Sequence, residues 1–344
     1  MSKKFDVVIG NPPYQEEAQG DGTRDTPVYH LFMDAAYEVG TKAVLITPAR
    51  FLFNAGFTPK AWNEKMLADP RLTVPHYVAN SNDLFPGTDI KGGIAVTYRD
   101  ADRVGEPIGT FTKYPELNDI LHKVLGGGFV PLSESITTSR SFRYTLKLYE
   151  DHPGLRALRP KGNEGLVESN AFEQFRSIFH ETKPVDGHEY VQVLGLQARV
   201  RTLRWIRDDY FDGPASFRKY KVALPKANGS GVLGEVLSSP AVIGPGVGTT
   251  HTFITIGAFD SESEALSCLK YVKTKFARTM LGVSKITQDN KRHAWKYVPL
   301  QDFTSASDID WSQPIPQIDR QLYAKYKLSD AEIAFIESHV KPMD

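Results

Sequence analysis

Four consecutive residues near the start of the chain, Asn11-Pro12-Pro13-Tyr14, are suited to holding a planar amino group. The prolines fix φ near −65° and lack N–H donors, so the carbonyl of Pro12 is expected to point outward without an intrachain partner. That carbonyl and the side-chain oxygen of Asn11 can accept both hydrogens of one NH2 group. The two hydrogen bonds draw the nitrogen lone pair out of ring conjugation toward a methyl donor, while Tyr14 offers a flat face for a base. The segment predicts methyl transfer to an exocyclic amino group.

The apolar run Phe5–Ile9, which comes directly before these residues, is typical of a buried parallel strand. In doubly wound sheets ligands bind at the carboxyl ends of the strands, which is where Asn11 to Tyr14 would lie. An ordinary proline-rich turn after a strand is the structural alternative. A tetrapeptide of this composition is expected by chance in roughly one per cent or less of chains of this length, so we favour the functional interpretation.

The chain resembles the γ-class N6-adenine DNA methyltransferases of restriction-modification systems, which include type II and IIG-like methylases. In that family Asn-Pro-Pro-Tyr is the fourth of a conserved series. Three later segments resemble the succeeding members in order: Thr26–Met33, Ala43–Leu52 and Asp83–Val96.

The resemblance implies that four residues are catalytic: Asn11, Pro12, Pro13 and Tyr14. It also implies S-adenosyl-L-methionine as cofactor and double-stranded DNA as partner. Candidates for stacking on the second face of the base are Phe85 and Tyr98.

The expected fold is α/β: half of a Rossmann-like class I methyltransferase sheet, followed by a mixed α+β target-recognition domain. Strands are predicted at 5–9, 43–47, 72–79 and 94–98, with helices near 27–39 and 59–68. Further helices are predicted at 115–125, at 261–281 and after the capping box of Ser329 and Glu332. The expected domains are a catalytic half (1–110), a connecting helical region (111–165), a DNA target-recognition domain (166–305) and a helical tail (306–344).

Basic residues interleaved with aromatic ones concentrate in the predicted recognition domain, a pattern that suits DNA phosphate contacts and stacking. A solvated basic surface with no ligand is the alternative for any single residue. The candidate DNA-binding residues are Arg199, Arg201, Arg204, Lys219, Lys221, Lys273, Lys275, Arg278, Lys285 and Arg292.

Composition narrows the class of protein. The 344 residues are 41% hydrophobic and 24% charged with zero formal net charge, which is ordinary for a globular protein and argues against a uniformly basic one. No membrane segment is expected. The single cysteine, Cys268, excludes an internal disulfide and a thiolate zinc cluster, so a cytoplasmic location is expected. His251 and His293 lack a second ligand at metal-binding spacing, and no metal is expected.

The resemblance also implies a cofactor site that is not visible in this sequence. In the γ order a Phe-x-Gly-x-Gly loop and a ribose-binding acid precede Asn-Pro-Pro-Tyr, yet ten residues precede Asn11. The glycine-rich segment Gly244–Gly248 leads into the β-branched run Thr249–Ile256, so we expect a turn between strands there and no cofactor loop. The hypothesis is a split methyltransferase completed by a separately encoded chain, or by a homo-oligomer, because an uncovered edge at Val7–Ile9 would aggregate.

Alternatives stay open at this point. The chain could be a non-catalytic DNA-recognition or specificity subunit, or a degenerate methylase remnant. It could also methylate a glutamine amide or ribosomal RNA, although the large region after the catalytic half argues against that. The DNA recognition sequence and any associated endonuclease cannot be derived.

Overall fold

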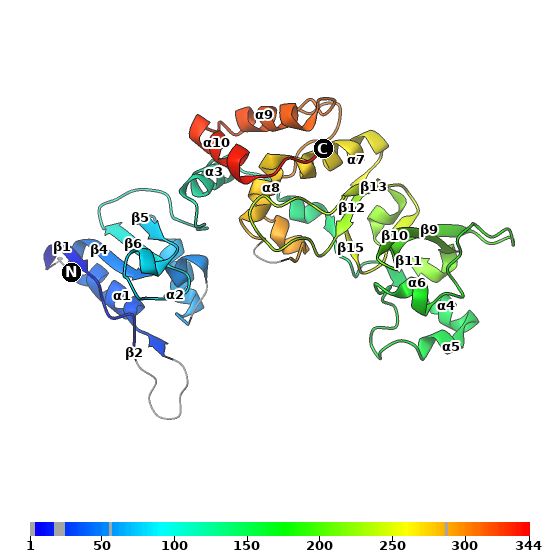
Figure 1. Ribbon diagram of the computed structural model, residues 1–344, viewed down its shortest axis with the longest axis horizontal. Helices are drawn as coiled ribbons and strands as arrows, with labels where there is room; N and C mark the ends of the chain where they lie inside the picture. Colours follow the sequence, from blue (N-terminus) through cyan, green and yellow to red (C-terminus); the bar gives the residue numbers. More distant parts are fainter. Residues whose placement is uncertain (1–3, 17–24, 55–56, 286–287) are drawn as a thin grey trace. The chain divides into compact units, whose positions relative to one another are not determined.

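The computed structural model describes residues 4–16, 25–54, 57–285 and 288–344. The chain forms two compact units, Met1–Asn118 and Asp119–Asp344, each with its own hydrophobic core (Figure 1). Helix α3 (Pro115–Gly126), predicted at 115–125, crosses the boundary between them. The finer division of the second unit at residues 165 and 305 stays a prediction.

A four-stranded sheet forms the centre of unit 1. Its strands are β1 (Phe5–Gly10), β4 (Gly40–Pro48), β6 (Ile94–Asp100) and β5 (Leu72–Val78), in the order β1-β4-β6-β5. All four agree with the strands predicted from the sequence. β1 runs parallel to β4, whereas β6 is antiparallel to both of its neighbours. The sheet is therefore mixed.

Helices α1 (Tyr29–Val39) and α2 (Lys60–Leu67) contribute to the core of unit 1. Tyr29, Met33, Ala36 and Tyr37 of α1 are buried, and their spacing of three to four residues places them on one helix face. They join Val8 of β1 in the same cluster. A short antiparallel ribbon of β2 (Gln15–Glu16) and β3 (Thr26–Pro27) connects β1 to α1 (Figure 1).

Strand β1 is an edge strand with an exposed apolar face. Val8 packs on the core, but Phe5, Val7 and Ile9 alternate with it and are 57%, 49% and 78% exposed. Within the described residues, β4 is the one strand that pairs with β1. Apolar strands of this kind are normally covered on both faces in parallel sheets.

The described residues of unit 2 form three small sheets. The first has the order β10-β9-β14, the second β13-β12-β15-β7 and the third β11-β8. Its strands are β7 (Ile136–Thr137), β8 (Arg143–Tyr144), β9 (Tyr190–Gln197), β10 (Val200–Arg207), β11 (Phe211–Asp212), β12 (Tyr220–Pro225), β13 (Ala241–Ile243), β14 (Val247–Thr249) and β15 (Phe253–Phe259). An aromatic-rich core that includes Phe142, Phe172, Phe175 and Phe217 packs beside β9 and β10.

The helices of unit 2 after α3 are α4 (Leu146–Asp151), α5 (Pro153–Arg156), α6 (Ala171–Gln174), α7 (Glu262–Lys273), α8 (Lys275–Gly282), α9 (Ile315–Lys325) and α10 (Asp330–His339). The predicted capping box at the start of α10 is confirmed, with Ser329 and Glu332 each bonded to the other's backbone. No helix in the described part of the chain is long and apolar enough to cross a membrane.

The single helix predicted at 261–281 is wrong, because the structure has two helices that meet at Thr274. Thr274 adopts an extended conformation, and its hydroxyl accepts a hydrogen bond from the backbone N–H of Ala277 as the N-cap of α8. The carboxylate of Asp319 accepts the N–H groups of Lys275 and Phe276. These acceptors satisfy the donors that a helix start leaves free.

Candidate active site

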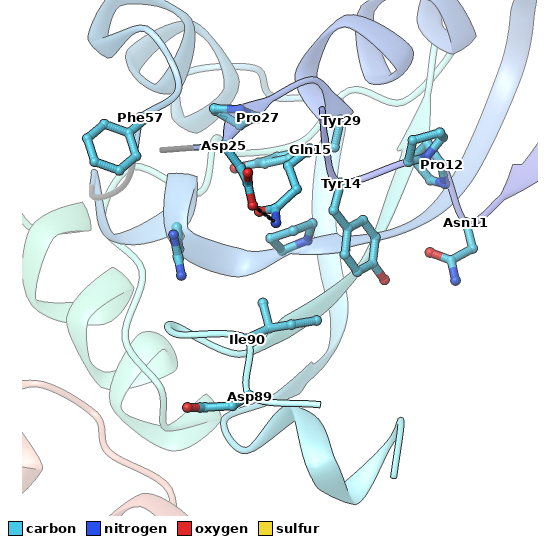
Figure 2. Close-up of a pocket in the computed structure, with 13 residues that line it drawn as sticks. Asn11, Pro12, Tyr14, Gln15, Asp25, Pro27, Tyr29, Phe57, Asp89 and Ile90 are labelled. Atoms are coloured by element: carbon cyan, nitrogen blue, oxygen red, sulfur yellow. Dashed lines mark hydrogen bonds between the residues drawn. The ribbon is translucent and has the colours of Figure 1, made fainter. Parts of the chain in front are cut away.

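The segment Asn11–Tyr14 leaves the carboxyl end of β1 and lines a cavity of about 730 Å³ in unit 1 (Figure 2). Four separate parts of the unit bring residues to this cavity. They are Asn11, Pro12, Pro13, Tyr14 and Gln15 after β1, Asp25, Pro27 and Tyr29 before and in α1, Pro48, Arg50 and Phe57 at the end of β4 and after it, and Asp89 and Ile90 before β6. The cavity volume lies in the range of small-ligand pockets.

Two polar groups of this segment have no hydrogen-bond partner among the described residues. In the described part of the chain no donor bonds to the carbonyl of Pro12, and the buried hydroxyl of Tyr14 has no hydrogen-bond partner. Burial raises the pKa of the Tyr14 hydroxyl, and the nearby Asn11 side chain partly offsets this, so the phenol is neutral. The backbone carbonyl of Tyr14 accepts the N–H of Val28 at 3.1 Å, which ties the segment to the start of α1.

Arg50 and Phe57 come from the segment after β4 and also line the cavity. The Nε of Arg50 donates to the carbonyl of Lys91 at 2.6 Å, while no described residue accepts a hydrogen bond from its terminal nitrogens. The loop can approach Arg50 because Gly92 has φ near +88°, and a Cβ there would lie 2.8 Å from Cγ of Arg50. Phe57 is 62% exposed and lies at the end of the cavity opposite Asn11 in Figure 2.

Charges of both signs surround the cavity. The carboxylates of Asp25 and Asp89 line it together with the guanidinium of Arg50. Asp25 accepts a hydrogen bond from the Gln15 side chain at 2.6 Å (Figure 2). Burial raises the pKa of Tyr29 to about 12, so that hydroxyl is also neutral. The cavity therefore combines aromatic and proline faces with neutral acceptors and a cation.

The two stacking candidates, Phe85 and Tyr98, are not among the described residues that line the cavity. Tyr98 lies in β6, and its hydroxyl donates to Asp100 at 2.9 Å. Phe57, which the sequence reasoning did not single out, is in the cavity wall. The signal in the sequence was that Phe57 follows the segment Ala43–Leu52, which resembles a motif of the family. No sequence pattern distinguishes Phe57 from other surface phenylalanines.

Three of the candidate DNA-binding residues, Lys221, Arg278 and Lys285, are buried in unit 2. The Lys221 ammonium donates to three backbone carbonyls, and burial lowers its pKa to about 8. Burial likewise lowers the pKa of Arg278 to about 10, and its guanidinium donates to the carbonyls of Lys273 and Gly234. These groups stabilise the fold, and their positions do not allow phosphate contacts.

Most of the other candidates are engaged by protein acceptors. Arg204 binds Glu181 at 2.9 Å and Gln197 at 2.6 Å. Intramolecular acceptors also bind Arg201 (Ser238, Ser239), Lys219 (Asp260), Lys273 (Asp344), Lys275 (Glu337) and Arg292 (Ser133). Arg199 is exposed and has no hydrogen-bond or ion-pair partner within the described ranges.

The glycine-rich segment Gly244–Gly248 is a turn between strands, as predicted. It joins β13 to β14, and β14 pairs with β9. A cofactor loop would instead lead into a helix. This segment therefore does not have the strand–loop–helix form of a glycine-loop cofactor site. In the same residues no group of three His, Cys, Asp or Glu side chains is placed to hold a metal ion.

Comparison with known proteins links residues 1–85 to the family model described as the Eco57I restriction-modification methylase. A protein of Mycoplasma pneumoniae (strain ATCC 29342 / M129 / Subtype 1), described as an uncharacterized adenine-specific methylase, is 32% identical over 94 residues, 26% of this chain. The match spans only 22% of that relative's length.

Two solved structures are similar over 97% of this chain at 10% identity and a TM-score of 0.34. One is the type IIG restriction endonuclease BpuSI, of which 53% is covered. The other is the type IIL restriction-modification enzyme MmeI in complex with DNA, of which 56% is covered. The chain thus spans about half of each of these two proteins.

Proposed function

We propose that this chain carries the target-base half of a site-specific DNA adenine-N6 methyltransferase of a restriction-modification system. The observation that carries the proposal is the cavity at the carboxyl end of β1, where Asn11–Tyr14 meet the residues that follow β4. The match of residues 1–85 to a restriction-modification methylase family supports it. The adenine-specific name of the Mycoplasma relative supports the choice of base.

In this proposal the side-chain oxygen of Asn11 and the carbonyl of Pro12 accept the two hydrogens of the adenine amino group. The free Pro12 carbonyl and the exposed Asn11 side chain agree with that role. The ring of Tyr14 stacks on one face of a base that has been flipped out of the duplex. Phe57 is the cavity residue best suited to contact the base from another side, and Arg50 to bind the adjoining phosphate.

The methyl group comes from S-adenosylmethionine, which we propose is bound by strands that pair with the free edge of β1. The unpaired edge of β1 would accept such strands, and the exposed face of Phe5, Val7 and Ile9 supports a completion that also buries these apolar side chains. The preferred source is a separately encoded chain, and a second copy of this chain is the alternative.

Unit 2 is proposed to bind double-stranded DNA and to determine the recognition sequence. Seven of the ten basic candidates are not buried, which supports a surface role for them. A non-catalytic DNA-recognition subunit is the second candidate function. It would be favoured by DNA binding without methyl transfer in the presence of a completing chain.

The product of the reaction tests the proposal. The chain is incubated with labelled S-adenosylmethionine and genomic DNA, ribosomal RNA or protein, with and without candidate completing chains from neighbouring genes. We expect label in duplex DNA as N6-methyladenine only with a completing chain. Label in RNA or in glutamine would contradict the proposal, and DNA binding with no label under any condition would favour the recognition subunit.

A further inference from the structure

The β9–β10 hairpin of unit 2 ends in a two-residue turn that contains no glycine. The two strands form eight registered pairs, from Arg207 with Tyr190 to Val200 with Gln197, which leaves Ala198 and Arg199 as the turn. Both turn residues have positive φ, 48° and 66°. Two-residue hairpin turns of this geometry normally use Asn-Gly, because a Cβ is disfavoured there.

The tip of the hairpin projects an unpaired cation. Ala198, Arg199 and Val200 are all exposed, and the described chain supplies no acceptor to the guanidinium of Arg199. Between Tyr190 and Arg207 the sequence contains no acidic residue. A long side chain in an unfavourable turn with no intramolecular bond is typical of a position retained for binding.

The rest of the hairpin is braced against unit 2. The Arg201 guanidinium donates to the carbonyls of Ser238 and Ser239 and lies 5.5 Å from the centre of the Phe253 ring. Arg204 binds Glu181 and Gln197, and Ile206 is fully buried at the base. Strand β9 also pairs with β14 on its other side. Arg199 is thus held at the end of a rigid ribbon.

We propose that the tip of the β9–β10 hairpin enters the major groove of DNA and that Arg199 reads a base there. This rests on the proposed function of unit 2 and names the element that carries sequence preference. A two-stranded ribbon fits the major groove, and a free guanidinium matches the two acceptors of guanine. Val200, 64% exposed beside Arg199, offers an apolar contact for a thymine methyl group.

A matched pair of variants separates the guanidinium from the turn. Arg199→Gly removes the side chain and relaxes the turn, whereas Ala198→Gly relaxes the neighbouring turn residue and keeps Arg199. Thermal denaturation is expected to show both variants at least as stable as the wild type. Any change in DNA recognition confined to Arg199→Gly then comes from the lost guanidinium.

The probe is a pool of duplexes with randomised central positions, bound by the full chain and sequenced after selection. We expect Ala198→Gly to select the same sequences as the wild type. Arg199→Gly should lose preference at one or two positions, with affinity for the selected sequence reduced about tenfold or more.

Equal selection by Arg199→Gly and Ala198→Gly would overturn the inference while leaving DNA binding by unit 2 intact. So would uniform weakening by Arg199→Gly across all sequences, because that indicates a phosphate contact. If the wild type binds no member of the pool at low salt, the proposed DNA-binding function fails, and this inference with it.

Discussion

Asn11 and Tyr14 both line the cavity, and in the proposed function they act through different groups. Asn11 contributes a polar acceptor, whereas the value of Tyr14 lies in its ring, because its hydroxyl is buried without a hydrogen-bond partner in the described chain. A stacking role and a hydrogen-bonding role for Tyr14 therefore predict different outcomes when the hydroxyl alone is removed.

Tyr14→Phe is expected to keep methyl transfer by the completed assembly within about threefold of wild type, because the ring remains. Tyr14→Ala should reduce it by about tenfold to a hundredfold, which corresponds to one lost base–aromatic stack. Methyl transfer to duplex DNA under subsaturating substrate measures both. Equal losses in the two variants would assign the function of Tyr14 to its hydroxyl.

Phe57 and Phe85 compete for the role of second aromatic contact to the base. Phe57 lines the cavity and Phe85 does not, so Phe57→Ala should weaken binding of an extruded base by about tenfold while Phe85→Ala leaves it unchanged. A fluorescent adenine analogue at the target position reports extrusion in both variants. A loss confined to Phe85→Ala would restore Phe85 as the stacking residue.

At the residue scale, the sequence predicts Asn11–Tyr14 as site residues because their chemistry is local, and these residues line the cavity. It could not identify Phe57, which the fold brings to the cavity from a segment that follows β4. Nor could it separate Lys221, Arg278 and Lys285 from surface cations, since their burial depends on carbonyl acceptors distant in the sequence.

At the scale of elements, the break between α7 and α8 depends on one buried carboxyl group, Asp319. Burial raises the pKa of Asp319 to about 6, although the N–H groups of Phe276 and Lys275 oppose this rise. Between about pH 4 and pH 6 the folded state binds more protons at Asp319 than the unfolded state does. The unfolding free energy contributed by this group therefore falls as the pH rises through that window.

Asp319→Asn should remove this fall, which amounts to about 2 to 3 kcal/mol for a shift of this size. Urea unfolding of wild type and variant at pH 4, 5, 6 and 7 measures it. Asp308→Asn, at an exposed position of the same unit, is the control and should keep the wild-type pH dependence. A slope that is the same in wild type and Asp319→Asn would contradict the account.

Element positions were largely predictable from periodicity and capping signals, as β1, β4, β5, β6 and α10 show. Strand order was not. The insertion of β6 between β4 and β5, antiparallel to both, follows from pairing between distant segments that the local pattern does not encode. The end of α7 at Thr274 was missed because the helix propensity of its neighbours continues across the break.

At the scale of the whole molecule, the proposed completion takes place at the edge of β1 that no described strand pairs with. Val7 is 49% exposed on that strand, and Leu31 is 58% exposed on α1. Val7→Lys should reduce self-association of the isolated chain and prevent its assembly with a completing chain. Leu31→Lys, the control, should allow assembly.

Sedimentation and co-purification measure these two effects. Isothermal titration with S-adenosylmethionine provides a further check. We expect binding by the assembly of this chain with a completing chain, and no binding by the isolated chain. A stable monomer that binds S-adenosylmethionine with micromolar affinity by itself would contradict the proposed completion at β1.

The central claim, that Asn11 and its neighbours activate an adenine amino group, is tested most directly by Asn11→Ala in the completed assembly. The measurement is the amount of N6-methyladenine released from duplex DNA by nuclease digestion and quantified by mass spectrometry, with DNA affinity determined in parallel. We predict a loss of methyl transfer of about a hundredfold or more with DNA affinity retained. Methyl transfer at the wild-type rate by Asn11→Ala would contradict the account.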